Sequence, residues 1–294
     1  MKILVTGASG FVGGAIATEL AAANHQIIGV VNRRQSLRPI QNVELIQADL
    51  SREWAFAGPV DCVIHASAVL PHDRYDASEL ISGNEAMMTE LVRWSAREGA
   101  QRIINLSSLA VYGQNSAAPI LSADTPVEPD TPYAKGKMAA ELILTEATRS
   151  TPASGITLRL PAVVGTGSHH NFPSNSLANV VNGKPLSITN PNSLYNHIVH
   201  VRELCRFVTQ LLKSGFPAHA CCVLGSSEPI TIRRFVEAML EYTGQEVPIS
   251  ESLSERSCPI VDYQSAARLG FTATSVLDTL KRFIAGSNMR AQGD

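Results

Sequence analysis

The chain has 294 residues, of which 45% are hydrophobic and 17% are charged, and its formal net charge at pH 7 is -2. This composition is typical of a globular protein with one large α/β domain or two unequal lobes. The small net charge and the lack of a long basic run argue against a surface for nucleic acids or anionic membranes.

The beginning of the chain partly resembles a signal peptide, but four glycines between positions 7 and 14 interrupt any apolar helix there. No stretch is long enough to span a membrane, so the sequence predicts a cytoplasmic protein without a membrane partner. Five cysteines without C-x-x-C spacing predict reduced thiols. His169-His170 has no third ligand nearby, and no metal site is predicted.

The first strand and helix are joined by a glycine-rich turn. Residues 3–6 are apolar and β-branched, as in a buried strand, and an amphipathic helical pattern begins near residue 12. A G-x-x-G-x-x-G turn in this position lets the backbone approach a pyrophosphate, which the free N–H groups of the helix stabilise. The alternative is a turn without a ligand. We predict a dinucleotide site, with these candidate residues: Gly7, Ser9, Gly10, Phe11, Val12 and Gly13.

Strand and helix signals then alternate along the chain. Strands are predicted at 26–31, 43–47, 60–64, 102–106 and 156–160, and helices at 77–98 and 133–148. This alternation predicts an α/β fold with a doubly wound parallel sheet of the Rossmann type. Ligands bind at the carboxyl ends of such strands, where further cofactor candidates lie: Asn32, Arg33, Asp49, Leu50, His65, Ala66, Ser67 and Ala68.

The pattern becomes irregular after the strand at 156–160. Residues 165–196 are rich in Gly, Asn, Pro and Ser, and helices are predicted at 201–212, 232–242 and 275–284, with a strand at 221–224. We therefore expect a dinucleotide-binding domain at 1–164 and a smaller, mainly substrate-binding lobe at 165–294, with part of 197–220 returning to the first domain.

A candidate acid/base group opens the helix at 133–148. Tyr133 and Lys137 lie four residues apart and so share one helix face, whereas Lys135 is offset. A phenol has an ordinary pKa of about 10, and a nearby ammonium together with a positive nicotinamide ring would lower it. Tyr133 could then exchange a proton with a carbonyl or alcohol while Ser108 holds the same oxygen. Alone, Y-x-x-x-K is a weak pattern; its place after Ser107-Ser-Leu-Ala-Val-Tyr-Gly113 makes it more specific.

Over nearly its whole length the chain resembles the extended short-chain dehydrogenase/reductase superfamily, in the branch of epimerases and dehydratases that act on nucleotide sugars. The resemblance implies that Ser108, Tyr133 and Lys137 are catalytic and that Asp49 binds the adenine amino group. It also implies that backbone at Pro161 and Val163 approaches the nicotinamide. The motifs that carry it are the glycine turn, Asp49-Leu50, His65-Ala66-Ser67-Ala68, Asn84, residues 107–113, Tyr133 with Lys137, Leu158-Arg159-Leu160-Pro161, residues 197–201 and Leu269-Gly270-Phe271.

Several matched positions also have a structural interpretation. Asn84 either satisfies helix backbone groups or takes part in a proton relay, and His65 packs beside the cofactor. Tyr112 is interpreted as a structural or pocket aromatic. His197 and His200 are expected to brace the substrate lobe.

Two departures limit what the resemblance implies. Leu109 and Ala110 stand where dehydratases of this family carry an Asp-Glu pair, which argues against a dehydratase. The segment 165–171 matches the nucleotide-sugar loop only loosely. We predict a nucleotide-sugar 4-epimerase or 4-keto reductase; the alternatives are an enzyme of a small non-nucleotide carbonyl or alcohol, and a non-catalytic NADP-binding regulator.

The cofactor preference and the oligomeric state follow from two local patterns. Asn32 and Arg33 stand where NAD enzymes carry an acidic residue, which favours NADP, with NAD as the alternative. The helix at 77–98 carries apolar residues beyond one core-facing stripe, and we expect a homodimer to cover them unless the small lobe does. These residues include Met87, Met88, Leu91, Val92 and Trp94.

Overall fold

The computed structural model describes residues 1–32, 40–55, 58–71, 75–114, 118–214, 217–256 and 258–288. They form two compact units that are interleaved in the sequence. The first unit comprises Met1–Gly113, Pro126–Arg159 and Val208–Cys222. The second comprises Gln114–Thr125, Leu160–Phe207 and Val223–Asp294.

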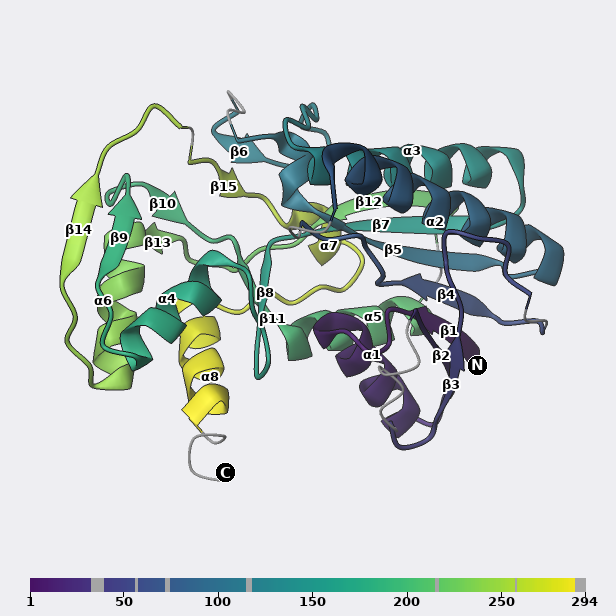
Figure 1. Ribbon diagram of the computed structural model, residues 1–294, viewed down its shortest axis with the longest axis horizontal. Helices are drawn as coiled ribbons and strands as arrows, with labels where there is room; N and C mark the ends of the chain where they lie inside the picture. Colours follow the sequence, from purple (N-terminus) through teal and green to yellow (C-terminus); the bar gives the residue numbers. More distant parts are fainter. Residues whose placement is uncertain are drawn as a thin grey trace. The chain divides into compact units, whose positions relative to one another are not determined.

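The first unit is built on a seven-stranded parallel sheet with helices on both faces, which confirms the predicted Rossmann architecture (Figure 1). The strand order is β12-β7-β5-β4-β1-β2-β3. The order reverses between β1 and β4, so that a crevice for a ligand opens at the carboxyl ends of these strands. The strands are β1 (Lys2–Thr6), β2 (Gln26–Val31), β3 (Val43–Gln47), β4 (Cys62–His65), β5 (Arg102–Ser108), β7 (Ser154–Leu160) and β12 (His219–Val223).

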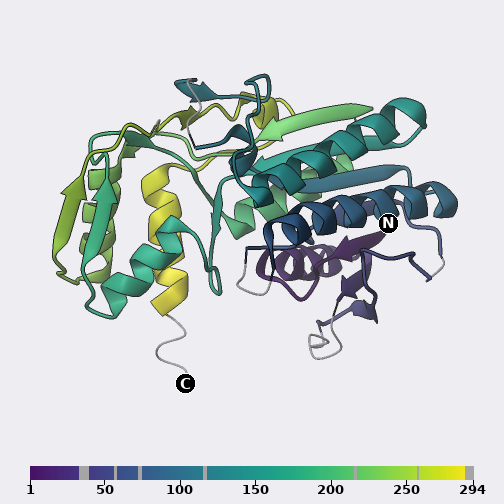
Figure 2. The ribbon, with the colours of Figure 1, turned by 45° about the horizontal axis from the view of Figure 1, so that its top comes forward.

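Two long helices, α2 (Ala77–Glu98) and α3 (Pro132–Ser150), lie side by side on one face of this sheet, and α1 (Phe11–Ala22) lies on the other (Figures 1 and 2). Asp76 and Glu79 form a capping box at the start of α2. The side chain of Thr131 caps α3, and Pro132 occupies its first turn. These signals explain why both helices begin where they do.

The contact between α2 and α3 requires a glycine. A Cβ at Gly136 would lie 2.6 Å from the carbonyl oxygen of Leu80 and 3.2 Å from the Cβ of Asn84. Any larger residue would push the helices apart, and with them the amino-terminal turns of α3 that carry Tyr133 and Lys137. The close packing therefore positions the candidate acid/base group.

The apolar residues of α2 face the core of the first unit rather than a partner. Met87, Met88, Leu91 and Trp94 are all buried there, and the partly buried Val92 packs against the same core. The expectation that these residues form uncovered surface is therefore wrong, because α3 and the sheet already cover them. The homodimer itself stays a prediction, now without this support.

The second unit contains short paired strands around three helices. Its core is formed by residues of α4 (Phe172–Val181), α6 (Ile232–Thr243) and α8 (Val276–Asn288) with the neighbouring strands. The strand pairs are β10 (Leu194–Tyr195) with β13 (Ile230–Thr231), β11 (Ile198–His200) with β8 (Ala162–Val164), β14 (Ile249–Ser252) with β9 (Leu186–Thr189), and β15 (Ile260–Val261) with β6 (Ile120–Leu121). The structure also contains helices α5 (Val201–Lys213) and α7 (Gln264–Ala267). None of the described helices is long and apolar enough to cross a membrane.

Candidate active and cofactor-binding site

The glycine turn lies between the end of β1 and the start of α1. Gly7 has a positive φ of 66°, and a Cβ at Gly13 would lie only 2.3 Å from the carbonyl oxygen of Gly7. Gly10 is the N-cap of α1, where no side chain caps the helix and no acidic residue stands in the first turn. Free N–H groups and the helix dipole can therefore bind an anion. These observations fit the pyrophosphate of a dinucleotide.

Thr6 joins the ends of β1 and β4. Its hydroxyl oxygen accepts hydrogen bonds from the backbone N–H groups of Ala66 (3.1 Å) and Ser67 (3.2 Å), and it lies 2.9 Å from Nδ1 of His65. Because these two N–H groups occupy both lone pairs of the hydroxyl oxygen, Thr6 is left to donate its proton to Nδ1 of His65, and His65 then carries its own proton on Nε2. Burial and the charge of Lys137 lower the pKa of His65 to about 3. His65 is thus a neutral, structural member of the site, and Thr6 is a site residue that the sequence analysis did not identify.

Asn84 fixes the segment that follows β4. Its amide oxygen accepts from the N–H of Val69, and its amide nitrogen donates to the carbonyl oxygens of Val69 and Leu80. The amide oxygen and one amide proton therefore hold Val69 against α2, and the other proton satisfies the carbonyl of Leu80 within the helix. This geometry agrees with the backbone-satisfying interpretation of Asn84; contact with a cofactor stays a prediction.

Two candidates for the adenosine end, Asn32 and Asp49, are exposed, whereas Leu50 is buried in the core of the first unit. Asp49 accepts hydrogen bonds from the hydroxyl and the backbone N–H of Ser51. These bonds and the charge of Arg52 lower the pKa of the Asp49 carboxyl, although its partial burial acts in the opposite direction. Asn32 is exposed at the end of β2, and Gln47 donates a hydrogen bond to its carbonyl oxygen. Arg33, on which the NADP preference depended, lies outside the described residues.

Ser108, Tyr133 and Lys137 come together at the carboxyl end of β5. The side chain of Ser108 is close enough to the Tyr133 phenol to lower its pKa, and the Ser108 oxygen accepts a hydrogen bond from the N–H of Ala110 at 3.1 Å. Lys137 is 2% exposed and donates a hydrogen bond of 2.6 Å to the carbonyl oxygen of Leu106. The structure thus places the three predicted catalytic residues in one cluster.

Burial dominates the electrostatics of this cluster. It lowers the pKa of Lys137 to about 8, with the charge of Glu141 acting in the opposite direction. The lysine is therefore an ammonium at pH 7. Burial also raises the pKa of the Tyr133 phenol, and the side chain of Ser108 only partly offsets this. The direction differs from that expected from the Tyr133–Lys137 spacing, because desolvation outweighs the other influences of the protein's own groups.

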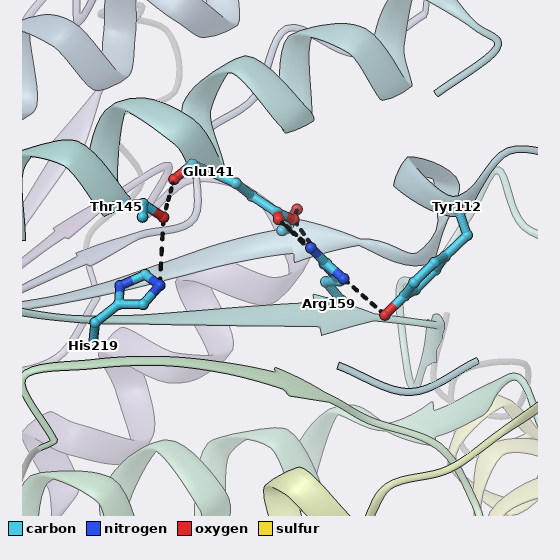
Figure 3. Close-up of polar contacts among 6 residues, drawn as sticks. Tyr112, Glu141, Thr145, Arg159 and His219 are labelled. Carbon is cyan, nitrogen blue, oxygen red and sulfur yellow. Dashed lines mark hydrogen bonds and ion pairs between the residues drawn. The ribbon is translucent and has the colours of Figure 1, made fainter. Parts of the chain in front are cut away.

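A buried ion pair lies behind the cluster and was not identified from the sequence. Arg159 of β7 forms a bidentate pair with Glu141 of α3 and donates a further hydrogen bond to the hydroxyl of Tyr112 (Figure 3). Tyr112 is fully buried, as expected for a structural aromatic. The signal available in the sequence was the spacing of Tyr133, Lys137 and Glu141, which places one polar residue on the same helix face at every turn.

Two predicted cofactor residues belong to the second unit. Pro161 lies between β7 and β8, and Val163 lies within β8, where its carbonyl oxygen accepts a hydrogen bond from Asn171. Their approach to a nicotinamide stays a prediction. Among the residues that the structure describes, no three His, Cys, Asp or Glu side chains are grouped to bind a metal ion.

Comparison with known proteins defines the family. The model of the NAD-dependent epimerase/dehydratase family matches residues 3–220. The chain belongs to this family. The resemblance to the extended short-chain dehydrogenase/reductases that act on nucleotide sugars is thereby confirmed.

Family members of two activities resemble the chain. It is 31% identical to a UDP-glucose 4-epimerase of Mycolicibacterium smegmatis over 163 residues, which is 49% of this chain and 50% of that protein. It is 25% identical to a dTDP-glucose 4,6-dehydratase of Neisseria gonorrhoeae over 84% of this chain and 80% of that one. The family therefore includes both epimerases and dehydratases, and the argument against a dehydratase rests on this chain's own residues.

The fold also has close structural counterparts. The structure of MoeE5 in complex with UDP-glucuronic acid and NAD aligns with a TM-score of 0.84 at 24% identity, covering 99% of this chain and 100% of that one. At this identity the likeness shows the fold alone. That structure holds NAD, so it gives no support to a preference for NADP.

Proposed function

We propose that the protein is an NAD-dependent nucleotide-sugar 4-epimerase. The observation that carries the proposal is the grouping of Tyr133 with Ser108 at the carboxyl end of β5, with the buried ammonium of Lys137 one helical turn away. An acid/base phenol beside a fixed positive charge suits proton exchange with a sugar hydroxyl. The relatives, which include a UDP-glucose 4-epimerase and a structure holding a UDP-sugar, support a nucleotide sugar as substrate.

Several residues would hold the cofactor. The first turn of α1 would bind the pyrophosphate, with Gly7, Gly10 and Gly13 allowing its approach. Asp49 would accept a hydrogen bond from the adenine, and Asn32 would lie at the adenosine ribose. Bound NAD would supply a hydride acceptor and, in its reduced form, a hydride donor for a ring carbon of the sugar.

The chain's own residues would handle the proton. In the proposed reaction Tyr133 takes the proton of the C4 hydroxyl as the C4–H bond breaks, and gives it back when that bond re-forms. Ser108 holds the same oxygen through both steps. Lys137 stabilises the phenolate, which is needed because burial raises the pKa of Tyr133.

Elimination of water is not supported by the residues next to Ser108. Leu109 and Ala110 begin a short 3-10 helix, η2 (Leu109–Tyr112). Neither side chain can donate or accept a proton. A 4,6-dehydration requires an acid and a base beside the sugar's C5 and C6 as well as the hydride transfer. The two residues that follow Ser108, where dehydratases of this family are expected to carry that acid and base, have apolar side chains in this chain.

A 4-keto reductase is the second candidate. Asn32 leaves the end of β2 without the carboxylate that disfavours a 2′-phosphate, and NADPH is the usual cofactor of net reduction. In this reaction Tyr133 would donate one proton to the carbonyl oxygen as the carbonyl is reduced.

The two candidates differ in net redox change. The purified protein would be incubated separately with UDP-glucose, UDP-galactose, UDP-glucuronic acid and a dTDP-4-keto sugar, and the products would be identified by NMR. Epimerisation predicts the same product ratio from either C4 epimer without net formation of NADH. Stoichiometric consumption of NADPH with the keto sugar would indicate the reductase. If none of these sugars reacts or changes the melting temperature, the nucleotide-sugar assignment is wrong.

A further inference from the structure

The pair formed by Glu141 and Arg159 is buried, with side chains that are 6% and 8% exposed. Nε of Arg159 lies 3.2 Å from each carboxylate oxygen of Glu141, and Nη2 lies 2.8 Å from Oε2. Burial opposes the charge of Arg159, but Glu141 raises the pKa of the guanidinium above its ordinary value. Removing one charge from such a pair leaves the other buried without compensation, which is costly.

This ion pair anchors the chain on both sides of Ser108. Before it, the Ser107 hydroxyl donates a hydrogen bond of 2.5 Å to Glu141. After it, Nη1 of Arg159 donates to the hydroxyl of Tyr112 at 2.9 Å, and the guanidinium carbon lies 4.9 Å from the centre of the tyrosine ring (Figure 3). The four residues from 108 to 111 are thus held between two fixed points, Ser107 and Tyr112, and the Ser108 hydroxyl has a defined position.

The pair also affects the charge state of Lys137 electrostatically. Glu141 lies one helical turn after the lysine and favours its charged form, whereas Arg159 is held on the far side of Glu141. Two other neighbours of Lys137 carry no charge: His65 of β4, which burial keeps neutral, and the carbonyl of Leu106 of β5, which accepts its hydrogen bond. The phenol of Tyr133 lies one turn earlier on the same helix. At the adjoining Gly136, α2 contributes the uncharged Asn84. Glu141 is therefore the negative charge that counters the burial of Lys137.

We propose that Glu141 and Arg159 are positioning residues of the catalytic group: together they fix Ser108 through Ser107 and Tyr112, and Glu141 keeps Lys137 an ammonium beside a buried guanidinium. The inference rests on the proposed function, in which Lys137 must be charged. It goes beyond that function because neither residue touches the reacting oxygen.

The electrostatic role can be measured without a substrate. Lysine side chains labelled with ¹³C at Cε would be titrated by NMR in the full-length protein, with Lys137 assigned from the Lys137→Met spectrum. Glu141→Gln should lower the pKa of Lys137 by about 1 unit or more. In Glu141→Gln/Arg159→Met no charge is left unpaired, and the pKa of Lys137 should lie between those of the wild type and the single variant. If the single variant does not fold, the pKa of Lys137 in the double variant still tests the electrostatic role.

Leu144→Ala is the matched control. Leu144 is fully buried on α3, so its truncation destabilises the same helix without changing any charge. It should leave the pKa of Lys137 at the wild-type value. If Glu141→Gln also leaves that pKa unchanged, or if the double variant lowers it as far as the single one, the electrostatic role is contradicted.

The positioning role is tested by removing the two anchors one at a time. Ser107→Ala and Tyr112→Phe should each lower kcat by ~10-fold or more because Ser108 is misplaced, with little change in KM and none in the pKa of Lys137. Unchanged kcat in both variants would overturn this part. The NMR titration fails or succeeds independently of the substrate, so failure of the inference is distinguishable from failure of the proposed function.

Discussion

The ammonium of Lys137 donates a hydrogen bond to the carbonyl oxygen of Leu106 across 2.6 Å, two residues before Ser108. This bond ties the first turns of α3 to the carboxyl end of β5. It fixes the spacing of the Ser108–Tyr133–Lys137 cluster, and it places a full positive charge where almost no water can reach it.

Replacing the buried ammonium should have opposite effects on stability and activity. Because the pKa of Lys137 is lowered from 10.5 to about 8, the unfolded chain binds its proton more tightly, and the buried charge costs roughly 3 kcal/mol below pH 8. Lys137→Met should therefore raise the free energy of unfolding at pH 7. Turnover should fall by ~10²–10⁴-fold because the phenolate loses its neighbouring charge.

The pH dependence and a neighbouring lysine provide the control. Wild-type stability should rise as the pH increases from about 8 towards 10.5, and Lys137→Met should lack this rise. Lys135→Met, two residues away on the same helix but exposed, should match the wild type in both stability and turnover. A Lys137→Met protein that keeps the wild-type rise in stability between about pH 8 and 10.5 would show that the buried charge of Lys137 is not its cause.

His65 should control stability in acid. Its pKa is lowered from 6.5 to about 3, so the folded state excludes a proton that the unfolded chain binds. The contribution is present above pH 6.5 and is lost as the pH falls towards 3. Replacing His65 with Gln should flatten the fall of the unfolding free energy over that range in denaturant titrations. His169→Gln, at an exposed histidine, should retain the wild-type slope; equal slopes in all three proteins would contradict the assignment.

The glycine turn should tolerate a methyl group at one position and reject it at another. A Cβ at Gly13 would lie 2.3 Å from the carbonyl oxygen of Gly7, whereas one at Gly10 would lie 3.2 Å from it. Gly13→Ala must shift the helix from the turn and should destabilise the protein by several kcal/mol, of the order of overpacking a core. Gly10→Ala should cost clearly less. Thermal unfolding checks the order, and similar losses in both variants would indicate that α1 adjusts more freely than the packing implies.

Cofactor selection should respond to Asn32. Asn32→Asp places a carboxylate at the end of β2, where it can accept hydrogen bonds from a ribose 2′-hydroxyl and repel a 2′-phosphate. The ratio of the Kd for NADPH to the Kd for NADH should increase by ~10-fold or more. Asn42→Asp adds the same charge at another exposed position and should leave the ratio unchanged. No change in the ratio with Asn32→Asp would place the ribose elsewhere.

The preference for NADP is a separate prediction, and it depends on Arg33. If Arg33 binds a 2′-phosphate, Arg33→Ala should weaken NADPH binding while leaving NADH binding nearly unchanged. Equal affinities of the wild type for both cofactors, together with no effect of the substitution, would show that the preference is wrong.

The sequence predicted the framework of the first unit well because each element there carries its own signal. Residues 27–31 are an apolar run, and α2 has a capping box at one end and Gly99 at the other. The short strands of the second unit gave no such signal, because two to four residues are too few for a periodic pattern.

The sequence predicted the site residues that are neighbours on one helix, but not those that packing brings together from distant segments. Tyr133 and Lys137 share a helix turn, so their spacing was informative. Thr6 meets His65 only because β1 and β4 are neighbours in the sheet, and Arg159 meets Glu141 only because β7 passes beneath α3. The pKa of Tyr133 depends on burial, which a spacing pattern does not report.

The most direct test of the proposed chemistry is the turnover of Tyr133→Phe on the nucleotide sugar that the wild type converts. Phenylalanine keeps the ring, so the fold and the affinity for NADH should remain, and these two measurements are the controls. Loss of the acid/base should lower kcat by ~10²–10⁴-fold, with a residual rate that no longer depends on the ionisation of a phenol. A Tyr133→Phe enzyme with the wild-type kcat and pH profile would contradict the assignment of Tyr133.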